Sequence, residues 1–327
     1  MINFTSTQAR TYSRLGQRGA IFGLALPELA QENPNIVALS ADLASLSGMD
    51  RYKSMFPDRF YNIGIAEQNM VGIAAGLSSE GFVPTVTTYA TFISLRSCEQ
   101  IRHFLGYMKM NVVVVGSGAG LVQSYSGSTH YAIEDMAVMR SIPNMVVLSP
   151  ADAGSAVMAF ESALKCKEPV YIRLTGGLNC PIVYKEPFDY QIGKSNVIIE
   201  GTDVVIYATG VMVSHAIKAV SLLQTSSISV KVVDMHTIKP IDRMEIEADL
   251  DCKLMVSLEE HNVIGGLGGA VSEVLSDYAN SPVLLKLGVH DAFGTVGDYE
   301  YLLSQNRLLP DQIAEDIKNK YEQLYKI

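Results

Sequence analysis

The stretch from Tyr61 to Leu77 reads YNIGIAEQNMVGIAAGL and sets a single carboxylate, Glu67, between an extended apolar run and a segment rich in small residues. After this acid, apolar side chains recur at the spacing of one helix face, at Met70, Ile73, Ala74 and Leu77. The spacing predicts a helix with Glu67 in its first turn, where exposed amides and the helix dipole stabilise negative charge. A carboxylate at a helix start needs no chemical role to explain it.

The neighbours of Glu67 favour a second interpretation. Apolar residues precede the acid and glycines follow it, at Ile63, Ile65, Ala66, Gly72 and Gly76. This composition predicts burial and close backbone packing, and a buried carboxylate is costly unless another group pairs with it. The residues around Glu67 therefore leave both a structural and a functional role open.

The composition is that of an ordinary globular chain. Its 327 residues, 48% of them hydrophobic, can bury at least one large core, and this length favours two domains over one. The formal charge of -9 and the scarcity of basic runs argue against nucleic acid or an anionic membrane as the main partner. The cysteines are too scattered for a disulfide framework or a metal site: Cys98, Cys166, Cys180 and Cys252.

The sequence shows no pattern typical of export or membrane insertion. Residues 1–11 are polar and lack an apolar h-region, and no run approaches the roughly 18 to 20 apolar residues of a membrane span. We therefore expect a cytoplasmic protein without a membrane partner.

Strand and helix patterns alternate along the chain in two blocks. In the first, residues 1–185, strands are predicted at 36–40, 60–65, 82–88, 111–115, 145–149 and 170–174, and helices at 8–29, 67–77, 91–107, 132–140 and 151–166. Residues 186–195 are the predicted linker, within a longer stretch of glycine, proline and polar residues that lacks periodicity.

The second block, residues 196–327, repeats the alternation, with strands at 203–208, 230–234, 253–257 and 283–287 and helices at 211–223, 241–248, 268–278 and 311–324. Such alternation predicts an α/β fold of two doubly wound parallel-sheet domains, each covered by helices on both faces. Asp42 and Leu43 directly follow the first strand, at the kind of strand end where open α/β sheets bind ligands.

Two glycine-rich segments raise the question of a nucleotide or anion site. Residues 116–120, GSGAG, follow a predicted strand, but they lack the G-x-G-x-x-G spacing and lead into further loop, so a dinucleotide site is the weaker interpretation. Residues 265–269, GGLGG, open a predicted helix whose amides could cradle an anion. A tight turn explains these glycines more simply.

Two further polar residues stand out, His130 and Arg173. His130 lies in a loop too polar for a core, which favours proton transfer or binding of a hydroxyl group. Arg173 interrupts an apolar strand, where an unpaired guanidinium would be costly to bury. We expect Arg173 at a strand end facing a phosphate or carboxylate, which its planar fork suits. The alternative is a salt bridge to a local carboxylate.

Several motifs, taken in order, resemble the pyrimidine-binding half of the transketolase family. They are SADL at 40–43, GIAEQN at 64–69, YATF at 89–92, TH at 129–130, IPN at 142–144 and YIR at 171–173. The segment EEHNVIGG at 259–266 resembles the C-terminal domain of the same family. Each motif alone is weak, but their joint order is specific and covers nearly the whole chain. Within this family, the chain resembles the C-terminal subunit of two-subunit transketolases.

The resemblance implies a role for each matching residue. Glu67 would be the catalytic glutamate that hydrogen-bonds the aminopyrimidine ring of thiamine diphosphate and favours the tautomer that accepts a proton from the thiazolium carbon. His130 would be the second catalytic residue, contacting substrate oxygens near the reacting carbon. The implied cofactor-binding residues are Asp42, Leu43, Ile65, Glu67, Tyr89 and Phe92, and the implied sugar-phosphate-binding residues are Arg14, Arg173 and His130.

The resemblance also implies a partner chain. Full-length members of the family hold the diphosphate of the cofactor and its Mg²⁺ in an N-terminal domain with a Gly-Asp-Gly motif, which is not found here. The pyrimidine end of thiamine diphosphate would then bind this chain, while an N-terminal subunit would hold most of the Mg²⁺ shell, and no metal ligand is expected here. We expect an α2β2 assembly that is active only when both chains are present.

The loop before His130 departs from the family pattern. Where the family often carries a histidine and an aspartate, this chain has Gly116 and the uncharged segment QSYSGS at 123–128. Ser128 replaces the proline that usually precedes the Thr-His pair. In the family, that aspartate is associated with recognition of a sugar hydroxyl group. The identity of the donor sugar therefore stays open, and a specialised substrate is compatible with the sequence.

The resulting hypothesis is transfer of a two-carbon ketol unit from a ketose, phosphorylated in the simplest case, to an aldose. Three alternatives stay open: a condensation of pyruvate like that of 1-deoxyxylulose-phosphate synthase, the β subunit of a 2-oxo acid dehydrogenase, and a non-catalytic assembly subunit. Release of CO₂ from pyruvate would identify either of the first two. A NAD-dependent oxidoreductase is the weakest rival.

Overall fold

Two sheets form the framework of the computed structural model, which describes residues 2, 4–223 and 228–325. From edge to edge, the first sheet contains β10 (Thr237–Lys239), β5 (Val146–Leu148), β6 (Val170–Leu174), β4 (Val113–Ser117), β3 (Val83–Tyr89), β1 (Ile36–Ser40) and β2 (Phe60–Asn62). The second contains β12 (Leu284–Val289), β11 (Leu254–Asn262), β8 (Val204–Ala208), β9 (Val230–Asp234) and β7 (Asn196–Ile199).

The predicted α/β fold is confirmed, with the correction that each sheet is mixed rather than wholly parallel. β10 pairs antiparallel with β5, and β7 pairs antiparallel with β9, whereas the inner pairings are parallel. Both antiparallel strands are short edge strands, so they lack the long apolar run by which a buried parallel strand is recognised. β10 comes from the second half of the sequence and extends the first sheet across the predicted domain boundary.

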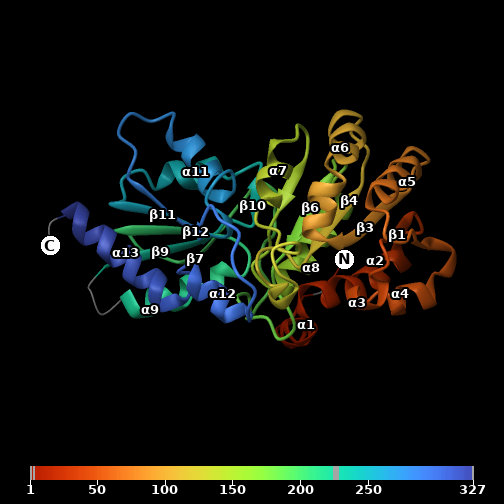
Figure 1. Ribbon diagram of the computed structural model, residues 1–327, viewed down its shortest axis with the longest axis horizontal. Helices are drawn as coiled ribbons and strands as arrows, with labels where there is room; N and C mark the ends of the chain where they lie inside the picture. The colour runs from red at the N-terminus through yellow and green to blue at the C-terminus, as the bar shows by residue number, and fades with distance from the viewer. Residues whose placement is uncertain (1, 3, 224–227, 326–327) are drawn as a thin grey trace.

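Helices cover both faces of the two sheets, which lie side by side along the long axis (Figure 1). In the first domain, one face carries α5 (Glu67–Ser79), α6 (Cys98–Gln100) and α7 (Asp135–Ser141), and the other carries α1 (Ser6–Gly19), α2 (Leu26–Glu32) and α8 (Ala153–Lys165). In the second domain, α11 (Leu267–Leu275) lies opposite α9 (Met212–Leu223), α12 (Tyr299–Gln305) and α13 (Pro310–Tyr325). Shorter helices are α3 (Ala44–Ser47), α4 (Asp50–Met55), α10 (Arg243–Ala248) and the 3₁₀ turns η2 (Pro57–Arg59) and η5 (Ser124–Ser126).

The core consists of one large apolar cluster on each face of the sheets. In β1, Ile36 and Ala38 belong to one cluster and Val37 and Leu39 to the other, because successive strand side chains point to opposite faces. Each cluster continues into the second domain, the first through α9 and the second through α11. The two domains therefore share their apolar cores.

The long predicted helix at 8–29 is interrupted at Gly16. This glycine has φ 70° and ψ 171°, and a Cβ atom there would lie 2.4 Å from the carbonyl oxygen of Gly177. Only glycine allows this close approach of two backbones. The helix then continues through the π-helical segment η1 (Ala20–Ala25) into α2. The kink brings residues 176–178 against α1.

The predicted helix at 91–107 is also irregular, since it is built from η3 (Phe92–Arg96), α6 and η4 (Ile101–Tyr107), of which η3 and η4 are π-helical. A π-helical turn holds an extra residue and is often found at functional sites. η3 ends on Arg96, which the site described below uses.

The two glycine-rich segments have structural roles in this fold. The GGLGG segment does cradle an anion, but the anion is Glu259 of the same chain, whose carboxylate accepts from the amides of Leu267 and Gly268 at 2.7 and 2.8 Å. The GSGAG segment ends β4 and runs into a loop, with Gly120 bridged to Ala132. Among the described residues, no helix is both long and apolar enough to cross a bilayer.

A buried acid in the second domain gives the folded state a pH dependence. Asp234, at the end of β9, is fully buried and accepts a hydrogen bond from the Tyr184 hydroxyl at 2.7 Å. Burial raises the pKa of Asp234 from its ordinary 3.8 to about 8. Because the folded chain holds this proton more tightly than the unfolded chain does, stability contributed by the neutral acid is lost as the pH rises through about 8.

Asp234→Asn, which stays neutral, is therefore expected to gain stability relative to the parent chain as the pH rises from about 4 to about 8. Urea unfolding at several pH values measures this difference. Asp251→Asn, at an exposed position, is the matched control. A difference for Asp234→Asn that does not change with pH would contradict the prediction.

Candidate active site

Glu67 is the first residue of α5 and is buried, with 2% of its side chain exposed. Both carboxylate oxygens accept from Nη1 of Arg96 at 2.8 Å. This ion pair explains how a carboxylate tolerates burial at this helix start. Arg96 itself is 46% exposed, so the pair lies at the surface of the molecule rather than in its interior. Beside it is a hollow lined by Ile65, Ala66, Glu67, Gln68, Asn69 and Arg96.

Three aromatic rings continue from this pair. The guanidinium carbon of Arg96 lies 4.3 Å from the centre of the Phe92 ring. Phe92 in turn lies 6.0 Å from Tyr89 and 5.2 Å from His130, measured between ring centres, and Tyr89 and His130 are 5.8 Å apart. The predicted residues Glu67, Tyr89, Phe92 and His130 are therefore brought together, with Arg96 as the link between the carboxylate and the rings.

The ring of His130 has one nitrogen engaged locally. Its Nδ1 lies 3.0 Å from Oγ1 of Thr129. Among the described residues, Nε2 has no hydrogen-bond partner, and the side chain is partly exposed. His130 can therefore present Nε2 to an oxygen atom of a bound molecule.

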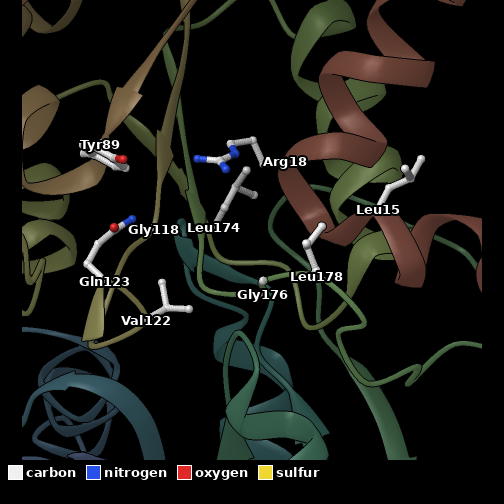
Figure 2. A pocket seen from close by; sticks show the side chains of 10 residues that line it. Leu15, Arg18, Tyr89, Gly118, Val122, Gln123, Leu174, Gly176 and Leu178 are labelled. Carbon is white, nitrogen blue, oxygen red and sulfur yellow. The ribbon is translucent and has the colours of Figure 1, made fainter. Parts of the chain in front are cut away.

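A second hollow adjoins Tyr89 and contains a cation that the sequence did not single out, Arg18. Figure 2 shows the guanidinium reaching from α1 into this hollow, with Tyr89 and Gln123 across from it. Burial lowers the pKa of Arg18, and the opposing effect of the nearby Tyr89 offsets only part of this decrease. The remaining wall is mostly apolar side chains and glycine backbone: Leu15, Gly118, Val122, Leu174, Gly176, Gly177 and Leu178. A guanidinium among such groups suits an anion.

Asp42, Leu43 and Ile65 follow the carboxyl ends of two neighbouring strands of the first sheet. Asp42 and Leu43 follow β1, while Ile65 follows its neighbour β2 and is 75% exposed. Asp42 adopts φ 62° and exchanges two hydrogen bonds of 3.0 Å with Asn62, from its amide to Oδ1 and from Nδ2 to its carboxylate. These contacts hold Asp42 against Asn62 at an exposed position.

The two arginines expected to bind a sugar phosphate are placed differently. Arg173 does face a carboxylate near the end of β6, but that carboxylate is Asp135 of the same chain, and the guanidinium is fully buried rather than exposed to a ligand as expected. Its Nε donates to Asp135 at 2.9 Å, and Nη2 donates to the carbonyl oxygens of Ala132 and Glu260. This is the salt bridge that the sequence left as the alternative. Burial lowers the pKa of Arg173 and Asp135 raises it, with a net increase.

Arg14 is exposed on α1 and does not line the hollow that contains Arg18. The sequence did not point to Arg18 or Arg96, and it named Gln123 only as part of the divergent segment 123–128. Arg18 lies four residues after Arg14 and Arg96 lies four residues after Phe92, so closeness in sequence to predicted site residues was the available signal, although Gly16 breaks the helix between Arg14 and Arg18.

Comparison with known proteins agrees with this fold. Residues 17–180 match the transketolase pyrimidine-binding domain, and residues 193–313 match the transketolase C-terminal domain. The chain belongs to the transketolase family, whose pyrimidine-binding and C-terminal domains it contains in that order.

Within the family, the chain is similar to separate C-terminal chains. It is 38% identical over 298 residues to a chain of Methanocaldococcus jannaschii named a transketolase C-terminal section, covering 90% of this chain and 93% of that one. It is 39% identical to a 6-deoxy-6-sulfo-D-fructose transketolase subunit of Clostridium sp., with 88% and 89% covered. A solved structure described as a split gene transketolase, inactive beta4 tetramer, superposes with a TM-score of 0.85 at 40% identity, covering 93% of this chain and 97% of that one.

Proposed function

We propose that this chain is the pyrimidine-binding subunit of a two-chain transketolase that uses thiamine diphosphate and transfers a two-carbon ketol unit from a ketose to an aldose. The observation that carries the proposal is the unbroken line of contacts from Glu67 through Arg96, Phe92 and Tyr89 to the hollow of Arg18. This line of contacts supports a single site that combines a buried acid, aromatic rings and a guanidinium. Similarity to transketolase C-terminal sections supports the same function.

The residues present fit the pyrimidine end of thiamine diphosphate. Glu67 faces a surface hollow, and releasing one oxygen from half-exposed Arg96 would give the ring a carboxylate acceptor in a largely dry position. When bound, the cofactor supplies a nucleophilic carbon that can carry a two-carbon unit. Phe92 and Tyr89 would contact its ring, while Asp42, Leu43 and Ile65 would border it beside the carboxyl ends of β1 and β2. The diphosphate and Mg²⁺ belong, on this proposal, to an N-terminal partner in an α2β2 complex.

We assign the charged end of the donor to Arg18, in place of Arg14 and Arg173. Arg18 points into a hollow beside Tyr89, whereas Arg173 is already paired with Asp135. One relative is named for a sulfonated sugar, and a sulfonate, like a phosphate, offers a guanidinium several anionic oxygens. The donor class is therefore a ketose with a terminal phosphate or sulfonate. Nε2 of His130 would hold an oxygen atom near the reacting carbon of this ketose.

Arg18→Ala is expected to raise the KM of the complex for an anionic donor roughly 10- to 100-fold, because the donor loses a charge-assisted hydrogen bond. The KM for the uncharged analogue of the same ketose should change much less. Steady-state kinetics with both donors measures the ratio, and Arg14→Ala, exposed on the same helix, is the matched control. Equal effects of Arg18→Ala on both donors would show that Arg18 does not bind the charge.

Reconstitution tests the proposed function as a whole. The purified chain with thiamine diphosphate and Mg²⁺ should show no ketol transfer, and activity should appear when an N-terminal diphosphate-binding chain is added. Full activity of the chain alone would refute the two-chain assembly. CO₂ release from pyruvate would instead favour a reaction like that of 1-deoxy-D-xylulose-5-phosphate synthase or of a 2-oxo acid dehydrogenase. The 1-deoxy-D-xylulose-5-phosphate synthase of Caldanaerobacter subterraneus is 33% identical to this chain and about twice its length.

A further inference from the structure

The loop that precedes His130 is held by the C-terminal domain. The backbone amide of Leu121 donates to Oε1 of Glu260 at 2.6 Å, across the domain boundary. The other oxygen of the same carboxylate accepts from the hydroxyl of Tyr299 at 2.6 Å. Glu260 is 1% exposed, and a Cβ atom added at Gly120 would lie 2.3 Å from its Oε1, so the loop backbone lies directly against this carboxylate.

Three weaker contacts fasten the rest of the loop to the segment 294–297. The hydroxyls of Ser124 and Ser128 donate to the carbonyl oxygens of Gly297 and Gly294, each at 3.1 Å. The hydroxyl of Tyr131 lies 2.7 Å from the carbonyl oxygen of Ser124 in the loop and 3.2 Å from that of Thr295, so it bridges the two segments. The departures of this loop from the family pattern therefore include residues that bind it to the C-terminal domain.

The anchored backbone is next to the residues that line the hollow of Arg18. Val122 and Gln123 follow Leu121 directly, and both line that hollow (Figure 2). Gln123 folds back over Gly118, whose φ of 65° and missing Cβ leave room for its amide. A shift of Leu121 would therefore move the wall that faces Arg18.

We propose that Glu260 of the C-terminal domain is a positioning residue for loop 118–130. By holding this loop, Glu260 keeps Gln123 opposite Arg18 and so sets which donor sugar the site accepts. The role in substrate selection rests on the proposed function, whereas the anchoring of the loop by Glu260 does not depend on it. A carboxylate suits this task because it accepts from two donors at once, and losing it would leave the Leu121 amide and the Tyr299 hydroxyl buried without a partner. The charged and titratable groups around Glu260 are Arg173, Asp135 and Tyr299, and burial raises its pKa to about 7.

The first arm of the test measures the loop in the chain alone by hydrogen–deuterium exchange. Glu260→Ala should speed exchange of the backbone amides of residues 119–123 by about tenfold or more, because one or two buried hydrogen bonds are lost. Glu260→Gln should restore slow exchange, because its oxygen can accept from Leu121 and its amide can donate to the Tyr299 oxygen. Tyr299→Phe, a milder change, should give an intermediate rate and keeps the test valid if Glu260→Ala does not fold.

The matched control is Glu259→Ala. Glu259 is the adjacent buried acid, but its carboxylate binds the amides that begin α11 and does not contact the loop. Its loss should leave exchange over residues 119–123 unchanged. Equal acceleration by Glu259→Ala, or none in Glu260→Ala and Tyr299→Phe, would overturn the inference.

The second arm uses the reconstituted complex and an anionic ketose donor. Glu260→Ala should raise the KM for the donor about tenfold while changing kcat less than threefold, and Glu260→Gln should restore the KM. Faster exchange with an unchanged donor KM would overturn the role in substrate selection. Absence of ketol transfer in every variant, including the parent chain, would refute the proposed function, while the exchange experiment would still decide whether Glu260 anchors the loop.

Discussion

Glu67→Gln is expected to lower the turnover of the assembled complex by about 10²- to 10⁴-fold, the usual contribution of a positioned acid or base. Glutamine keeps the size of the side chain and can still accept a hydrogen bond from Arg96, but it cannot share a proton with a ring nitrogen as a carboxyl group does. The measurement is kcat of the reconstituted complex with saturating thiamine diphosphate, together with the mass of the complex in solution, which should not change.

The control for this prediction is Glu300→Gln, an exposed acid in the first turn of α12. It tests whether the loss of any helix-start carboxylate affects turnover, and it should have almost no effect. Removing the half-exposed Glu67–Arg96 pair should cost about 1 kcal/mol of stability or less, so unfolding cannot account for the lost activity. If Glu67→Gln retains most of its turnover, Glu67 has only the structural role that its helix position allowed.

Asp135→Ala is expected to destabilise the chain by about 3 to 5 kcal/mol, because it leaves the guanidinium of Arg173 buried without its counter-ion. Asp135 accepts from Nε of Arg173 and also from the hydroxyl of Tyr171 at 2.7 Å, so two buried donors lose their acceptor. Urea unfolding of the purified chain measures the change. Arg173→Met should cost a similar amount, since it leaves the carboxylate unpaired.

The double variant Asp135→Leu with Arg173→Met provides the contrast. It removes both charges, so it should recover much of the stability that either single change loses. Arg307→Met, which breaks an exposed ion pair with Asp316, should cost about 1 kcal/mol or less. If Arg173→Met folds normally and only raises the KM for a phosphorylated donor, Arg173 contacts the substrate after all.

The sequence predicts the local elements of this protein well where a pattern is long. The helix that begins at Glu67, the strand at 36–40 and the strand at 170–174 agree with α5, β1 and β6, because each has an uninterrupted apolar pattern. The prediction failed for β7 and β10, which are short edge strands whose pairing depends on distant partners. It also gave no signal for the close backbone approach between Gly16 and Gly177.

For the site, the sequence indicated what kind of group each residue needs better than it indicated which residue supplies that group. It correctly indicated that a buried Arg173 needs an anion, but local sequence cannot show whether that anion is a ligand or Asp135, which lies 38 residues earlier. Arg14 and Arg18 have the same side chain on the same helix, and only the fold shows that Arg18 reaches the hollow beside Tyr89.

The sequence by itself therefore determined the α/β class, the order of the two domains and the helix start that holds Glu67, since these follow from periodicity and from motifs in a fixed order. Tertiary structure alone decided which charges pair. Glu67 binds Arg96, Arg173 binds Asp135, and Glu260 of the C-terminal domain binds the amide of Leu121. The physical reason is that an ion pair or hydrogen bond depends on distances of a few ångströms between residues far apart in the chain, which the packing of the sheets sets.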